Sequence, residues 1–87
     1  MPPRDPRLCP MLERAMPGDV APGSVRVCDW PEPWLVLFGD GELHPVHIRS
    51  RSTSRSGRKV IAIEWHADGG TWQESYVVDA ARMREPD

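Results

Sequence analysis

The chain has 87 residues, eleven of them basic and thirteen acidic, and a chain this short builds one domain around one modest core. The near-neutral charge balance excludes a uniformly basic surface of the kind that coats nucleic acid or membranes. No apolar stretch is long enough to span a membrane, and the N-terminus lacks the layout of a secretory signal. We therefore expect a soluble, cytoplasmic protein without a membrane partner, and the sequence leaves its oligomeric state open.

Prolines crowd the first third of the chain, where eight of the ten lie before residue 34. This density predicts a proline-rich, partly ordered N-terminal arm over residues 1–23. Apolar residues between positions 8 and 16 allow at most two helical turns, which Pro17 and Gly18 would end. Because so short a helix is unstable alone, we expect the arm to contribute no more than about 2 kcal/mol to folding.

Residues 24–87 show the alternation of strands and are predicted to form a small β-barrel domain. Short strands are expected at residues 25–28, 34–38, 46–49, 61–65 and 72–78. The glycines at 39 and 41 indicate one turn, and the Ala-Asp-Gly-Gly sequence at 67–70 indicates a tight hairpin. Near the C-terminus, Asp79 is expected to cap a single helical turn that brings Met83 onto the open end of the sheet.

The hairpin at 67–70 also predicts a register. If the turn centres on Asp68 and Gly69, Trp65 lies opposite Trp72 and large side chains share one face. Shifting the pairing by one residue would place glutamine and serine on that apolar face. The pattern therefore favours the Trp65–Trp72 pair, with Ile61 opposite Tyr76.

The segments Val60–Trp65 (VIAIEW), 67–70 (ADGG) and Tyr76–Met83 (YVVDAARM) resemble the small barrels of the SH3-like and Tudor-like class. The resemblance covers roughly residues 24–85 and concerns architecture. It implies a mainly β, five-stranded antiparallel barrel with a short helical turn near the C-terminus. The acid-and-aromatic groups with which Tudor domains read methylated side chains have no counterpart here, so that ligand does not carry over.

Metal and catalytic chemistry find little support in the sequence. His44, His47, His66 and Cys28 are the candidate soft ligands, but their spacing fits no common zinc pattern. Motifs for a nucleophile or a phosphate-binding glycine loop are missing as well. We therefore expect a non-enzymatic protein without cofactor and with Cys9 and Cys28 as thiols; a zinc-stapled structural domain is a further alternative.

The main positive signal is the segment 49–59, which combines cations with serines and lacks acids. A loop of this composition is suited to phosphates, because cations neutralise backbone charge while hydroxyls and amides donate hydrogen bonds. We expect a binding module, an accessory or regulatory protein, that contacts nucleic acid through Arg49, Arg51, Arg55, Arg58 and Lys59. The alternative is a solvated, mobile loop, or a loop whose positive charges are neutralised by acidic residues of the same molecule.

Four tryptophans are many for a domain of this size. Trp65 is expected in the core, whereas Trp30 and Trp34 stand beside prolines and are expected at the surface. An exposed tryptophan near proline suits a base or a partner's proline-rich segment. A protein-interaction adaptor is therefore the second hypothesis, and its candidate residues are Trp30, Trp34, Trp72 and Tyr76. Alternatively, these side chains attach the arm to the barrel, and Trp72 and Tyr76 belong to the core.

Overall fold

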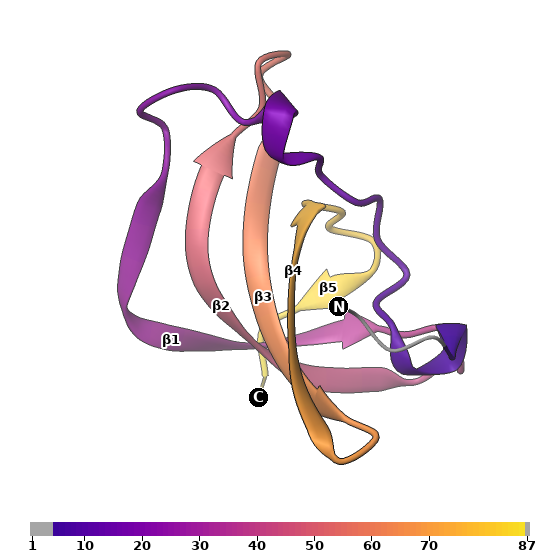
Figure 1. Ribbon diagram of the computed structural model, residues 1–87. Coiled ribbons are helices and arrows are strands. Elements are labelled where there is room, and N and C mark those ends of the chain that lie inside the picture. Colours follow the sequence, from indigo (N-terminus) through magenta and orange to yellow (C-terminus); the bar gives the residue numbers. More distant parts are fainter. Residues whose placement is uncertain (1–4, 87) are drawn as a thin grey trace.

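The computed structural model describes residues 5–86, which form a single sheet of five antiparallel strands. The strands are β1 (Arg26–Leu37), β2 (Leu43–Thr53), β3 (Lys59–Ala67), β4 (Gly70–Val77) and β5 (Met83–Arg84), in the spatial order β4-β3-β2-β1-β5. Figure 1 shows the sheet curling into a half-barrel. The predicted mainly β fold of five antiparallel strands is confirmed. The predicted closed barrel is not formed by the sheet, because no pairing joins β4 to β5 within residues 5–86.

Strand β1 differs from the prediction, since the two short strands expected at 25–28 and 34–38 are one strand of 12 residues. Its register against β2 shifts between Val27 and Glu32, so residues 28–31 lie opposite Arg49 alone. Such a bulge bends a strand, and β1 turns sharply along the lower left of Figure 1. Pro31 lies within the bulge, whereas Pro33 lies in the regular ladder opposite His47.

The β3–β4 hairpin has the predicted register. Trp65 is opposite Trp72, and Ile61 is opposite Tyr76. Asp68 and Gly69 form the turn, and their φ angles of 52° and 72° are those that an Asp-Gly pair accepts. The alternation of large and polar side chains therefore determined this pairing, as the sequence indicates.

The N-terminal arm is extended rather than helical over most of its length. Two 3₁₀ turns, η1 (Pro6–Leu8) and η2 (Pro17–Asp19), flank a segment that pairs with the sheet. The amide of Met11 donates to the carbonyl of Leu37 on β1, and the amide of Ala15 donates to that of Ser75 on β4. The two helical turns that the sequence allows between residues 8 and 16 do not form, because hydrogen bonds to β1 and β4 replace the local ones.

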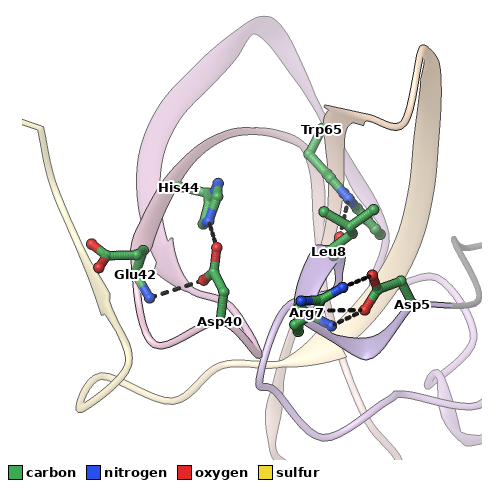
Figure 2. Close-up of polar contacts among 7 residues, drawn as sticks. All are labelled: Asp5, Arg7, Leu8, Asp40, Glu42, His44 and Trp65. Carbon is green, nitrogen blue, oxygen red and sulfur yellow. Dashed lines mark hydrogen bonds and ion pairs between the residues drawn. The ribbon is translucent and has the colours of Figure 1, made fainter.

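Close backbone contact holds the beginning of the arm. A Cβ added at Gly39 would lie 2.1 Å from the carbonyl oxygen of Pro6, so a glycine is needed where η1 crosses the β1–β2 turn. Figure 2 shows the indole Nε1 of Trp65 donating to the carbonyl oxygen of Leu8 at 3.0 Å. The arm is thus tied to the deepest aromatic residue of the sheet.

The core fills the concave side of the half-barrel and draws on every long strand. Its fully buried members include Val36, Ile48, Ile63 and Trp65, and Leu12 joins them from the arm. Phe38 meets Trp65 edge to face with ring centroids 6.0 Å apart. The core therefore includes a side chain from the arm, which the sequence analysis treats as a weakly attached segment.

The C-terminal segment ends in a turn and a short strand instead of the expected helical turn. The carboxylate of Asp79 accepts from the amide of Ala81, and the amide of Arg82 donates to the carbonyl of Asp79. The chain then pairs with β1, where Met83 lies opposite Val36. Met83 does pack against the core, but it arrives there as part of β5.

Candidate functional site

The basic segment 49–59 is a hairpin rather than a long loop. Strand β2 continues to Thr53 and β3 begins at Lys59, so only residues 54–58 form the turn. The hydroxyl of Ser54 is buried and accepts from the amide of Arg58 at 2.9 Å. The predicted basic loop is therefore mostly strand. Ser50 and Ser52 are partly buried and alternate with exposed arginines, so a polar sequence continues the sheet.

Three of the five cations expected to bind nucleic acid form ion pairs within the molecule. The pairs are Arg49–Glu64 at 3.5 Å, Arg51–Glu32 at 2.6 Å and Arg58–Glu13 at 2.7 Å. The hydrogen bond from Arg51 is the main cause that lowers the pKa of the Glu32 carboxyl. Each arginine in these pairs is about half exposed, so the pairs contribute little stability but reduce the positive potential of the hairpin.

The other two cations, Arg55 and Lys59, form no ion pair with any residue between 5 and 86. The backbone of Arg55 is held by the carbonyl of Asp19 in η2. Lys59 lies opposite Thr53 at the start of β3. Of the five cations, three are therefore compensated by acids within the described chain and two are not.

The four candidate partner-binding aromatics lie in different environments. Tyr76 is 3% exposed and belongs to the core, while Trp34 and Trp72 are half-buried and pack against it. Trp72 also donates its indole hydrogen to the carbonyl of Ala67 at 2.8 Å. Burial corrects the placement of Tyr76 on a partner-binding surface, and only Trp30, at 81% exposed, presents its whole side chain.

Around Trp30, the first half of β1 forms an exposed strand edge. Strand β5 pairs with Leu35 and Val36 only, and no other strand covers Arg26–Pro33 on that side in the described part of the chain. Val27 is 77% exposed on the same stretch. We call residues 25–30 the β1 edge. It combines backbone that no strand within residues 5–86 covers on its outer side with large exposed apolar side chains.

A shallow pocket lies where β1 begins, β2 ends and β3 begins. Its volume is about 290 Å³ and its cations are Arg26, Arg51 and Lys59. Val60 and Ile61, both almost fully buried, form part of its wall. Arg26 is a residue that the sequence analysis missed. No local signal points to it, because its position opposite Arg51 is decided by the register shift in β1.

The metal-ligand candidates are dispersed. His44 binds the carboxylate of Asp40 at 2.7 Å, as Figure 2 shows, and stacks on Phe38. The amide of Glu42 and then His44 lower the pKa of Asp40. Among residues 5–86 no group of three histidine, cysteine or acidic side chains has an arrangement that could hold a metal ion. In the same residues Cys9 and Cys28 form no disulfide with each other.

Comparison with known proteins gives no assignment: no family model matches the chain, no curated protein is similar to it, and no solved structure matches its fold. Within the described residues, no helix is long and apolar enough to cross a membrane.

Proposed function

We propose that this protein is a non-enzymatic interaction module that takes an extended segment of a partner protein onto the β1 edge. The observation that carries the proposal is the exposure of Trp30 and Val27, at 81% and 77%, beside backbone that no other strand covers between residues 5 and 86. Isolated exposed apolar residues are common, but two beside an open strand edge form a docking surface.

The backbone geometry suits strand addition. Proteins normally protect a sheet edge with proline, charge or a covering segment, because unpaired amides and carbonyls invite another strand. Here Pro31, at the end of the bulge, and Pro33, beyond it, protect the following part of β1 and leave the β1 edge open. An extended peptide can add there, with main-chain hydrogen bonds supplying affinity and side-chain contacts supplying specificity.

Charge sets the chemistry of the partner segment. Arg26 and Asp29 are both exposed and have opposite sign within the β1 edge. The complementary segment therefore carries an acid and a base spaced to meet them, and an apolar residue that packs on Trp30. A central aromatic residue of this kind usually accounts for most of the binding energy of an interface.

Selection of peptides from a displayed library of extended seven- to nine-residue segments, roughly the length of one strand, tests this proposal. The expected binders carry mixed charge and shift the amide resonances of residues 25–30. Trp30→Ala should weaken their binding by about tenfold or more.

Leu43→Ala is the matched control, because Leu43 is an exposed apolar residue on β2 outside the β1 edge. Binders that keep their affinity for Trp30→Ala, or a selection that yields none, overturn the proposal. Concentration-dependent self-association that Trp30→Ala abolishes would identify a second copy of this chain as the occupant and overturn the choice of a different partner.

Contact with nucleic acid is the second candidate function. Arg55 and Lys59 support it, because neither forms an ion pair with an acid in the described part of the chain. It ranks second because Glu13, Glu32 and Glu64 neutralise the other three cations. If it holds, replacing Arg51, Arg55, Arg58 and Lys59 by alanine lowers the slope of log affinity against log salt by up to about 3 to 4 units. An unmodified protein without salt-dependent binding to single- or double-stranded nucleic acid contradicts it.

The SH3-like or Tudor-like closed barrel belongs to the same proposal, as does the cytoplasmic location expected from the sequence. The hydrogen bonds from the arm to both β1 and β4 support closure by residues 9–15. In this arrangement the arm covers the two edges near the core and leaves the β1 edge as the place for a partner.

A further inference from the structure

The pocket at the beginning of β1 concentrates positive charge. Arg26 and Arg51 lie directly opposite each other on neighbouring strands, and Lys59 completes the group from β3. Like charges placed opposite each other in a sheet are unfavourable unless something neutralises them. No acidic side chain is among the residues that line this pocket.

The cations have few competing partners within the described chain. Arg26 donates from one terminal nitrogen, Nη1, to the carbonyls of Gly23 and Val25, which fixes its guanidinium and leaves its other N–H groups available. Lys59 makes no ion pair or side-chain hydrogen bond with residues 5–86. Glu32 reaches Arg51 from outside the pocket lining. The pocket therefore keeps an excess of positive charge.

The remainder of the lining combines hydroxyl groups with an apolar wall. Ser52 and Thr53 contribute hydroxyls that can donate hydrogen bonds, while Val60, Ile61 and Val78 supply apolar surface. The volume of about 290 Å³ lies just below the range for drug-sized ligands, about 300 to 1,000 Å³, so the pocket suits a smaller molecule. These dimensions fit one charged group on a small apolar body.

We propose that this pocket binds a small phosphate monoester whose apolar part rests against Val60, Ile61 and Val78. One arginine can bind both oxygens of a planar carboxylate. A phosphate monoester has three terminal oxygens, so the cations of β1, β2 and β3 can each contact one, and the three cations therefore favour phosphate. The pocket shares Arg26 with the β1 edge, but its other residues lie outside that edge, and the proposal does not depend on the proposed function.

Titration of isotope-labelled protein with phenyl phosphate, followed by nuclear magnetic resonance, tests the site. We expect saturable shifts at the amides that surround the pocket, in residues 24–26, 51–53, 59–61 and 78. Benzoate should bind more weakly, and benzyl alcohol, which has no charge, should produce no saturable shift at equal concentration.

Variants separate the site from general electrostatic attraction. Lys59→Ala should weaken phenyl phosphate binding by about fivefold or more, because it removes one charge-assisted contact. Glu32→Gln should strengthen binding, because it removes the acid that competes for Arg51. Arg55→Ala removes an equal charge from the turn outside the pocket lining and is the matched control, with affinity expected to stay unchanged.

Equal weakening by Lys59→Ala and Arg55→Ala would show attraction to net charge alone and overturn the proposal. Shifts that do not saturate, or that fall elsewhere, would overturn it as well. A short single-stranded oligonucleotide that displaces phenyl phosphate and binds more tightly would reassign the pocket to a nucleic-acid backbone. The two tests share the amides of residues 25 and 26, but the decisive variants differ, because Lys59 lies outside the β1 edge and Trp30 lies outside the pocket lining. Failure here therefore leaves the test of Trp30 and the β1 edge unaffected.

Discussion

Gly39 shows how a single residue fixes the path of the arm. The carbonyl oxygen and carbon of Pro6 lie 2.1 and 2.8 Å from the place where a Cβ would stand, so any side chain collides with backbone that cannot rotate away. We expect Gly39→Ala to displace η1 and to lower the free energy of unfolding by about 1 to 3 kcal/mol. Chemical denaturation measures the change.

Gly18→Ala is the control for that measurement, because nothing lies within 4 Å of the position where its Cβ would stand. This variant should be close to neutral. A Gly39→Ala protein as stable as Gly18→Ala would show that the arm yields easily at this crossing, against the close contact described above.

Tyr76 links burial to alkaline stability. Desolvation is the main cause that raises the pKa of its phenol above the ordinary value of about 10. Above about pH 10 the unfolded state therefore releases a proton that the folded state keeps, so stability is full below this pH and falls as pH rises. As the chain has one tyrosine, tyrosinate absorbance follows the group directly. Denaturation curves of Tyr76→Phe should lose this part of the alkaline decline; an unchanged decline would contradict the role of Tyr76.

At the scale of elements, the arm behaves as part of the sheet. Leu12 is 8% exposed and belongs to the core cluster, whereas Met16, a few residues later, is 58% exposed. Leu12→Ala should cost about 2 to 5 kcal/mol, the range for a large buried side chain, and Met16→Ala should cost little. Thermal or chemical unfolding of the two variants measures this difference. Equal stability of the two variants would support the weakly attached arm that the sequence predicts.

The elements that the sequence predicts best are those that local rules decide. The Asp68–Gly69 turn and the alternation around Trp65 determined the β3–β4 register. The path of the arm was not predictable, because apolar residues at 8, 11, 12, 15 and 16 also allow a short helix, while the hydrogen-bond partners of this segment are on β1 and β4. Such distant partners leave no local signal.

The same distinction applies to the candidate sites. Trp30 is exposed, as its neighbouring prolines indicate, but the same pattern placed Trp34 at the surface, and Trp34 is half-buried against the core. Arg26 reaches the pocket through a bulge that no local pattern marks. The basic composition of 49–59 was read correctly, but the acids that pair with Arg51 and Arg58 come from distant segments. Charge compensation therefore depends on the topology, which the sequence does not display.

For the whole molecule, the arm is the link between the two edges of the half-barrel. Its backbone bonds the end of β1 through Met11 and the edge of β4 through Ala15. Its carbonyl at Leu8 also satisfies the indole of Trp65, which is otherwise buried in the core. A small domain has little surplus stability, so the loss of such a link affects the entire fold.

Removal of residues 1–15 should therefore abolish cooperative folding. The packing of Leu12 contributes about 2 to 5 kcal/mol, and each lost hydrogen bond about 1 kcal/mol. The free energy of unfolding of a whole domain is only about 5 to 15 kcal/mol. Circular dichroism and tryptophan fluorescence during denaturation measure the loss. A synthetic peptide of residues 5–16 added to the truncated chain should restore the folded signal, and the same peptide with Leu12→Ala should restore much less. A truncated chain that unfolds cooperatively within about 2 kcal/mol of the full chain would show that the half-barrel is self-sufficient.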